Sequence, residues 1–199
     1  MGLTTRGFHG HEPSTTHKLP PGQHETQGFP VLSAGPTPRI ALDRWQLTIT
    51  TEHAKTHAWS WPQFLDLPQE QVRADIHCVT RWSKFDTLWR GVAVDTLLGS
   101  VDTSAAYVTV RSYGGYTTNL PIADVRNGRA WIVHQYDGRP LAPEHGGPAR
   151  LLVPHLYFWK SAKWISGLTL TTEDRPGFWE VSGYNNYGDP WREQRYTGD

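Results

Sequence analysis

Cys78 is the only cysteine in this chain of 199 residues, and its thiol is the side chain with the most distinctive chemistry. It lies at the C-terminal end of the strand that we expect at residues 73–80. A strand end can hold a reactive side chain rigidly while the next loop admits a ligand. Arg81 and Lys84 follow closely, and nearby cations favour the thiolate form. The thiol is therefore either a buried structural side chain or a reactive one.

A second group of candidate residues lies between positions 141 and 165. His145 and two glycines precede Arg150, which interrupts the apolar start of an expected strand at residues 149–153. A guanidinium held there needs an anionic partner or several acceptors, and a bound phosphate would be such a partner. A Gly/Pro loop that simply runs into a core strand is the simpler interpretation, and it stays open.

Other chemistries fit these residues less well. Zinc needs three or four Cys, His or carboxylate ligands, and a single cysteine gives no CxxC pair. His77 and Cys78 are adjacent, so on a strand they point to opposite faces. Pairing of Cys78 with a later histidine, as in a Cys–His protease, has no local signature here but stays open. The sequence has no GxGxxG or P-loop pattern, and Gly114–Gly115 is typical of a hairpin turn.

Composition excludes several classes of protein. The 19 Lys and Arg balance the 19 Asp and Glu, so we expect no nucleic-acid partner, because phosphate backbones are bound by an excess of cations. No run of about 18 apolar residues is present, so we expect no membrane partner and no spanning helix. The N-terminus has no apolar segment typical of a secretory signal, and we expect a cytoplasmic protein unless an export segment has been removed.

The elements that must position these residues are mostly short strands. Nineteen Gly and fifteen Pro argue against a helical bundle, since both residues favour turns. We expect residues 1–28 to be an N-terminal arm, partly extended or disordered, and residues 29–199 to be a single domain. Period-2 alternation and apolar runs predict strands at 45–51, 73–80, 107–110, 116–120, 130–133, 149–153 and 163–170, with short helices near residue 61 and at the end of 91–98. The predicted fold class is α+β with a mixed β-sheet.

Three motifs together resemble the molybdopterin-binding domain of the sulfite oxidase family. They are Cys78 in its loop, the segment His-Gly-Gly-Pro-Ala-Arg-Leu-Leu-Val-Pro at 145–154, and Lys-Trp-Ile at 163–165. The likeness spans roughly residues 27–191 and is greatest to small bacterial sulfite-oxidase-like oxidoreductases, through the segments at 77–86 and 188–196. The fold implied is the β-rich sulfite-oxidase type with short helices.

The resemblance implies a molybdenum–molybdopterin cofactor and assigns roles to single residues. Cys78 would be the thiolate ligand of molybdenum, which needs one protein ligand because the pterin supplies two further sulfurs. His145 and Arg150 would hold the pterin and its phosphate, and the segment Ser161, Ala162 and Lys163 would close over the phosphate. Tyr116 aligns with a tyrosine near the metal's oxo ligand, although it could equally fill the core. Residues 29–32 resemble a loop that touches the pterin, and Arg81 is a candidate for attracting an oxyanion substrate.

These assignments predict an oxidoreductase that moves an oxygen atom on or off a small substrate, with electrons exchanged through a separate partner protein or carrier. The substrate is either a sulfite-like oxyanion or a sulfoxide or N-oxide. Val79 and Thr80 stand where sulfite oxidases have a Gly-Asn-Arg-Arg type run, so the anion pocket is only partly present. The alternative is a non-catalytic binding module that kept the fold and lost the cofactor.

Overall fold

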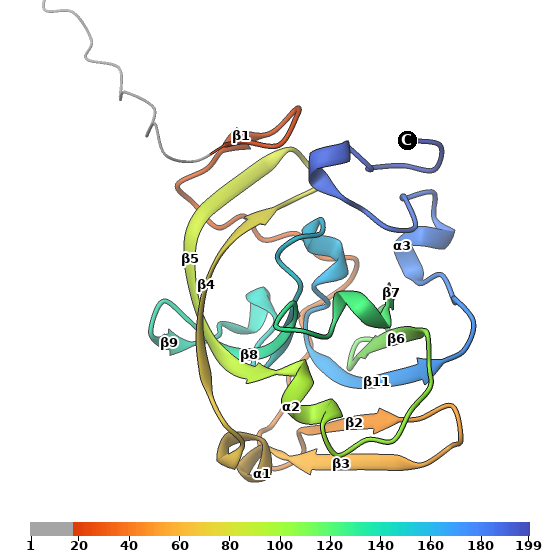
Figure 1. The fold of residues 1–199 in the computed structure, drawn as a ribbon. Coiled ribbons are helices and arrows are strands. Elements are labelled where there is room, and N and C mark those ends of the chain that lie inside the picture. Colours follow the sequence, from red (N-terminus) through yellow and green to blue (C-terminus); the bar gives the residue numbers. More distant parts are fainter. Residues whose placement is uncertain (1–17) are drawn as a thin grey trace, which may run out of the picture.

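Two β-sheets form the frame of the molecule in a computed structural model that describes residues 18–199 (Figure 1). Helices are few and short, so the prediction of a sheet-rich α+β fold is confirmed. Of the expected N-terminal arm, residues 1–17 lie outside the described residues. Residues 18–28 lie along the first sheet, where His24 and Glu25 pair with Trp82 and Ser83.

The first sheet has the order β1-β5-β8-β10, with β4 also paired to β5 and β9 to β8. Its strands are β1 (His24–Glu25), β4 (Glu70–His77), β5 (Trp82–Ala93), β8 (Trp131–Tyr136), β9 (Arg139–Pro140) and β10 (Arg150–Leu152). β4 and β5 form a long antiparallel hairpin whose turn is residues 78–81. Cys78 is therefore the first residue of a tight hairpin turn, directly after the strand that we expected to position it.

β5 corrects two sequence predictions. We expected a polar loop after Cys78 and, within 91–98, an edge turn that leads into a short helix, but the chain is a strand throughout Trp82–Ala93. Two of its polar residues are buried with partners: Ser83 contacts the His77 ring nitrogen Nδ1 at 2.8 Å, and the Thr87 hydroxyl donates to the Ala74 carbonyl. Gly91 lies so close to Ile132 that a Cβ would fall 2.1 Å from its carbonyl oxygen, at a register shift between β5 and β8.

The second sheet has the order β3-β2-β11-β6-β7. Its strands are β2 (Gln46–Thr50), β3 (Thr56–Ser60), β6 (Tyr107–Ser112), β7 (Thr117–Pro121) and β11 (Ile165–Thr171). β6 and β7 form the predicted hairpin, and β11 pairs antiparallel with β6 but parallel with β2, so the sheet is mixed. The alternation at residues 46–50 predicted β2 correctly, because Leu47 and Ile49 point into the core while their neighbours do not.

The helices are short connections. They are α1 (Trp61–Asp66), α2 (Val94–Leu98) and α3 (Phe178–Val181), with 3₁₀ turns η1 (Ile122–Asp124), η2 (Pro143–His145), η3 (Phe158–Lys160) and η4 (Pro190–Arg192). α1 begins with a capping box, in which Ser60 and Gln63 satisfy each other's backbone donors. Within residues 18–199 no helix has the length and apolar character that a bilayer crossing requires.

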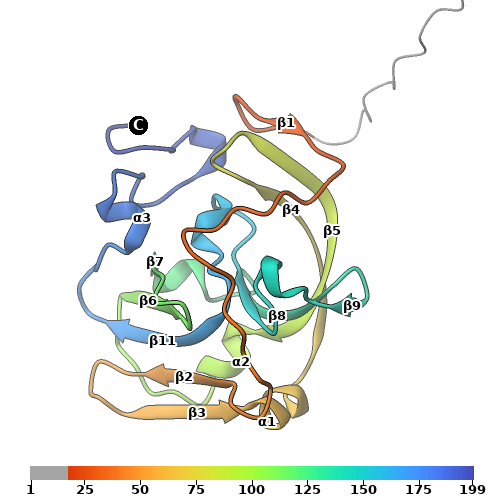
Figure 2. The same cartoon turned by 180° about the vertical axis from the view of Figure 1, so that it is seen from behind.

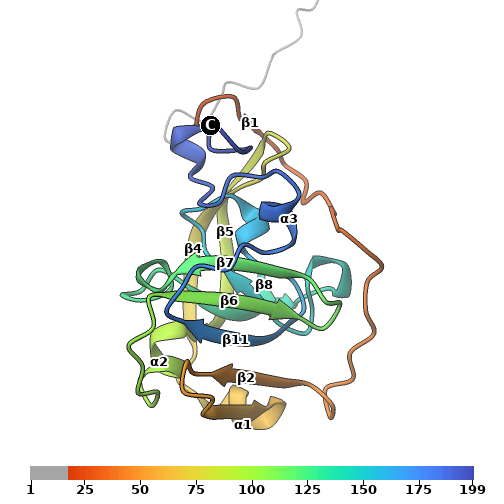
Figure 3. The same cartoon turned by 90° about the vertical axis from the view of Figure 1, so that its right-hand side faces the viewer.

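Apolar residues from both sheets form the main core, with members on β2, β6, β8, β10 and β11. The segment between β1 and β2 crosses one face of the molecule, from the β4–β5 hairpin tip to the second sheet (Figures 2 and 3). The C-terminal segment after β11 returns to the same hairpin tip, which lies beside β1 (Figure 1). The tip that carries Cys78 is thus enclosed by both ends of the described chain.

Candidate active site

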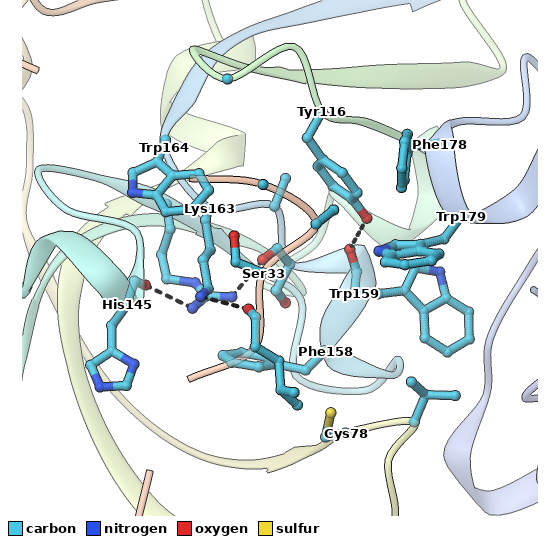
Figure 4. Close-up of a pocket in the computed structure, with 18 of the residues that line it drawn as sticks. Ser33, Cys78, Tyr116, His145, Phe158, Trp159, Lys163, Trp164, Phe178 and Trp179 are labelled. Carbon is cyan, nitrogen blue, oxygen red and sulfur yellow. Dashed lines mark hydrogen bonds between the residues drawn. The ribbon is translucent and has the colours of Figure 1, made fainter. Parts of the chain in front are cut away.

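A cavity of about 530 Å³ opens beside Cys78. Its walls come from parts of the chain far apart in sequence: the crossing segment at 29–38, the β4–β5 turn, the β6–β7 turn, the loop before β10, the segment around η3, and α3. Seven of the eight predicted site residues line it: Cys78, Tyr116, His145, Arg150, Ser161, Ala162 and Lys163. Figure 4 shows His145, Lys163 and Trp164 on one side, Trp159, Phe178 and Trp179 on the other, and Cys78 between them.

The sulfur of Cys78 points into this cavity from the hairpin turn (Figure 4). The turn is closed by hydrogen bonds from the Arg81 N–H to the Cys78 carbonyl at 3.0 Å and from the Cys78 N–H to the Trp82 carbonyl at 2.8 Å. The thiol is 8% exposed, and burial raises its pKa. The Thr80 hydroxyl, 3.1 Å from the sulfur, opposes this rise in pKa.

Arg150 carries the main positive charge of the cavity wall. It is 1% exposed, and its guanidinium donates to the carbonyls of His145 (2.9 Å), Ser161 (2.5 Å) and Leu151 (3.3 Å). Its carbon Cζ also lies 4.0 Å from the centroid of the Phe158 ring. No carboxylate among residues 18–199 pairs with it, and three of its five N–H groups account for the hydrogen bonds just given. Two N–H groups are left for an anion in the cavity.

Lys163 extends this cationic side of the cavity, and His145 lies beside it. Lys163 Nζ donates to the carbonyls of Glu144 (2.6 Å) and Leu32 (2.8 Å), which ties the crossing segment to the site. Burial and the charge of Arg150 lower the pKa of Lys163 to about 8, and burial, Lys163 and Arg150 lower the pKa of His145. The His145 ring stacks on Phe29 at 4.0 Å. Phe29 lies in the segment that resembles a pterin-contacting loop.

Glycines allow the loop at 145–150 to pack against the site. Gly146 has φ of 106°, and a Cβ there would lie 3.0–3.1 Å from Lys163 and Arg150. A Cβ at Gly147 would lie 2.1 Å from the Leu141 carbonyl oxygen. The motif therefore needs both glycines, because larger residues would push His145 and Arg150 away from the cavity.

Ser161 and Ala162 support this wall through their backbone. The Ser161 carbonyl accepts from Arg150, its hydroxyl accepts from the Val153 N–H at 2.8 Å, and the Ala162 carbonyl accepts from the Leu151 N–H at 2.9 Å. These bonds join the segment to β10, so its position relative to Arg150 is fixed.

Tyr116 and four aromatic residues form the other side of the cavity. The Tyr116 hydroxyl donates to the Trp159 carbonyl at 2.7 Å, and burial, followed by the negative charge of Glu180, raises its pKa well above the usual value, so it is a neutral donor. We call the four the aromatic side: Trp159, Phe178, Trp179 and Tyr184. Trp179 stacks on Tyr184 at 4.8 Å, and Trp159 meets Tyr184 edge-on at 5.1 Å.

A buried ion pair fixes the aromatic side. Lys160 Nζ lies 2.7 Å from Glu180 Oε1, with both side chains at most 1% exposed. Lys160 also donates to the carbonyls of Asn119 and Asn186. Trp159 Nε1 donates to the same Glu180 oxygen at 2.9 Å, so α3 and its aromatic residues are held against η3.

The structure does not bring Arg81 to the other predicted site residues. It is exposed, has a positive φ of 75°, and does not line the cavity. Its guanidinium lies beside Gly22, where a Cβ would be 3.6 Å from Nη1. The hairpin turn reverses the chain between Cys78 and Arg81, so a separation of three residues places the two side chains on different sides.

Sequence reasoning did not find the aromatic side or Arg195. The aromatic residues converge only through tertiary folding, so no local pattern marks them. Arg195 belongs to the segment at 188–196 that resembles the small bacterial proteins, but that segment carried no assigned role. Its guanidinium donates to the Val79 carbonyl at 3.2 Å, directly behind Cys78.

Comparisons with known proteins agree with the geometry. Residues 34–179 match the family described as "Oxidoreductase molybdopterin binding domain". The chain is 40% identical over 185 residues to "Uncharacterized oxidoreductase YuiH" of Bacillus subtilis, covering 92% of this chain and 93% of that protein. It is 34% identical over 135 residues to "Putative protein-methionine-sulfoxide reductase subunit YedZ1" of Azospira oryzae, covering 66% of this chain and 51% of that protein.

Among solved structures, the fold is similar to that of the sulfane dehydrogenase SoxCD from Paracoccus pantotrophus. The TM-score is 0.67 at 18% identity, and the match covers 74% of this chain and 43% of that one. At this identity the likeness concerns the fold, and it confirms the prediction of a β-rich sulfite-oxidase-type architecture.

Proposed function

Since this chain belongs to the family of oxidoreductase molybdopterin-binding domains, as its motifs predicted, we propose that it is a molybdenum-cofactor enzyme that transfers an oxygen atom from a neutral sulfoxide. One observation carries the proposal: the single cysteine and a fully buried guanidinium, which has no carboxylate partner within residues 18–199, face the same cavity. A soft thiolate and an unpaired cation are what a metal bound to an anionic organic cofactor requires.

The residues present fit the cofactor. Cys78 would ligate the metal, and Arg150, Lys163 and His145 would hold the pterin and its phosphate. Burying two cations side by side without an anion is unfavourable. Burial lowers the pKa of both Arg150 and Lys163, and the charge of Arg150 lowers the pKa of Lys163 further. An anionic group in the cavity relieves both effects. When bound, the cofactor supplies the two-electron redox chemistry.

The chain's own residues then act on the substrate. Tyr116 offers a neutral hydroxyl at the cavity wall. Its one proton is donated to the Trp159 carbonyl, so it would reach a substrate oxygen only by leaving that carbonyl. The aromatic side excludes water and packs against apolar substituents. Reduction of a sulfoxide then needs two electrons and two protons, and gives a thioether and water. The electrons come from a separate one-electron carrier, and the relative named a reductase subunit supports such a partner.

A neutral substrate is favoured over sulfite by the distribution of charge. Within the described residues, Arg150 and Lys163 are the lysine and arginine side chains that line the cavity, and both lie on the cationic side assigned to the cofactor. The opposite side is aromatic. A sulfite dianion would have no remaining cation as a partner, whereas the methyl groups of a sulfoxide fit an apolar wall.

Metal analysis with steady-state kinetics tests the proposal. Purified wild-type protein should contain molybdenum, show visible absorption from the thiolate–metal bond, and reduce dimethyl sulfoxide with a reduced viologen dye as electron donor. Cys78→Ser, a near-isosteric control, should fold but lose the absorption and the turnover. Oxidation of sulfite without sulfoxide reduction would refute the substrate class. Protein that folds after expression with the cofactor yet holds no metal would favour the non-catalytic binding module.

A further inference from the structure

The carbonyl of one peptide group in the Cys78 turn has no hydrogen-bond donor within the turn. Residues 78–81 form a β-turn in which the Arg81 N–H donates to the Cys78 carbonyl. The central peptide, between Val79 and Thr80, takes no part in that bond. The two common turn types differ by a flip of this central peptide, and the flipped type would need a positive φ at Thr80, which is unfavourable for a β-branched residue and is not observed. A contact from outside the turn adds to this preference.

Arg195 provides that contact. Its guanidinium donates from Nη1 to the Val79 carbonyl at 3.2 Å and from Nη2 to the Pro21 carbonyl at 3.0 Å. The residue is 4% exposed and packs over the Tyr157 ring at 5.1 Å. Gln23 Nε2 donates to the neighbouring Cys78 carbonyl at 3.0 Å. The carbonyls of Cys78 and Val79 are therefore bound by side chains from the two ends of the described chain.

The orientation of this peptide determines what faces the sulfur. In a trans peptide the C=O and N–H groups point in opposite directions. With the Val79 carbonyl held on Arg195, the Thr80 N–H points away from Arg195. The Thr80 hydroxyl lies 3.1 Å from the Cys78 sulfur, and the hydroxyl and the backbone N–H groups of Thr80 and Val79 lower the pKa of the thiol against the larger effect of burial.

We propose that Arg195 is a positioning residue that locks the central peptide of the turn, so that the backbone donors face the Cys78 sulfur. Donors to a thiolate withdraw electron density from it and thereby tune a bound metal. This consequence for the metal rests on the proposed function, in which Cys78 is the ligand. Arg195 does not line the cavity, and it contacts the turn through the Val79 carbonyl, while its charge also lowers the pKa of the Cys78 thiol.

The competing explanation is that Arg195 only joins the ends of the chain. It contacts Pro21, and its Nη2 lies 3.5 Å from the half-exposed carboxylate of Glu193. Loss of a purely structural contact would lower global stability and affect all core amides alike. Loss of a peptide lock would act first on the Thr80 amide, because that N–H reverses when the peptide flips.

Hydrogen exchange measured by NMR on the full chain, made without cofactor, separates the two explanations. In Arg195→Met we expect the Thr80 amide to exchange at least tenfold faster than in wild type, while the β11 amides of Leu168 and Leu170 are unchanged. Arg195→Lys, which keeps a charged donor, should restore part of the protection. Arg192→Met is the matched control, since Arg192 is an exposed arginine in the same segment, and it should resemble wild type.

The loaded protein gives a second readout. In Arg195→Met the visible thiolate–metal absorption should move to longer wavelength, because the sulfur has lost donors and gives more electron density to the metal. Unchanged Thr80 exchange, or an equal increase at Thr80 and in β11, would overturn the proposal. Wild-type protein that holds no molybdenum would refute the proposed function instead, and the exchange data would still decide whether Arg195 orients the turn.

Discussion

Replacement of Arg150 by methionine should weaken cofactor binding without unfolding the protein. Methionine keeps an unbranched apolar chain of similar length against Phe158, but it removes the charge and all five N–H groups. Two of those N–H groups are available to the cavity. A charge-assisted hydrogen bond to phosphate contributes about 1.5–3 kcal/mol, so the dissociation constant should rise roughly 10- to 150-fold.

The stability of the cofactor-free protein depends on two opposing effects. Burial lowers the pKa of Arg150 from its ordinary value to about 9, so holding the charged guanidinium in the folded state costs about 5 kcal/mol. Its three hydrogen bonds to backbone carbonyls offset this by roughly 1 kcal/mol each. Methionine removes the cost together with the bonds. The melting temperature of cofactor-free Arg150→Met should therefore stay within a few degrees of the wild-type value.

Pterin content per chain, measured by fluorescence after denaturation and oxidation, is the assay, alongside thermal unfolding of the cofactor-free protein. Arg150→Lys should be intermediate, because lysine keeps the charge but not the planar fork. Arg139→Met, an exposed arginine on β9, is the control and should leave both measurements unchanged. Full pterin occupancy in Arg150→Met, combined with a fall of more than about 10 °C in melting temperature, would show that Arg150 is structural and refute the reasoning.

Three further predictions follow from the site. The pKa of Lys163 is lowered to about 8, so its charge is present below that pH and lost above it. Sulfate binding to the cofactor-free protein, measured by calorimetry, should weaken from pH 7 to pH 9, and Lys163→Met should abolish this step. Tyr116→Phe should lower kcat for dimethyl sulfoxide by about 10- to 100-fold at unchanged molybdenum content, and an unchanged kcat would exclude the hydroxyl from the reaction. Arg81→Met should change KM for a charged and a neutral substrate by the same factor, within about twofold, because Arg81 lies outside the cavity; a selective loss for the charged substrate would restore its predicted role.

Local alternation was enough to predict the strands whose two faces differ. β2 and β6 have buried aliphatic side chains at every second position, with polar neighbours between them. Alternation did not predict the start of β5 as a strand, because Ser83 and Thr87 are polar residues that are buried. Their hydrogen-bond partners lie across the hairpin, and the sequence does not reveal them. β3 was missed because it is half-exposed at the edge of its sheet and has no clear apolar face.

The candidate site was predictable where motif order and spacing matched a known family, as for Cys78, His145 and Arg150. Those residues lie on separate elements, and only the fold shows that they share one cavity. Arg81 was predicted as a site residue because it is close to Cys78 in sequence, but the tight turn directs its side chain to the outer surface, away from the cavity. The cation that contacts the Cys78 turn is Arg195, which follows it by more than a hundred residues.

Two buried cations near the cavity show why an anion belongs there. Lys160 and Arg150 are equally inaccessible, but Lys160 has a carboxylate at 2.7 Å and several carbonyl acceptors, and it holds η3 against α3. Arg150 has carbonyl acceptors alone among the described residues, and free N–H groups at the cavity wall. Without the Glu180 carboxylate, Lys160 would also be a buried charge with no counter-ion, and the free-energy cost of burying it would rise. The fold therefore does not tolerate buried charge in general, and the unpaired state of Arg150 needs its own explanation. The cost therefore falls on the cations that face the cavity, Arg150 and beside it Lys163, and an anionic cofactor is the partner that removes it.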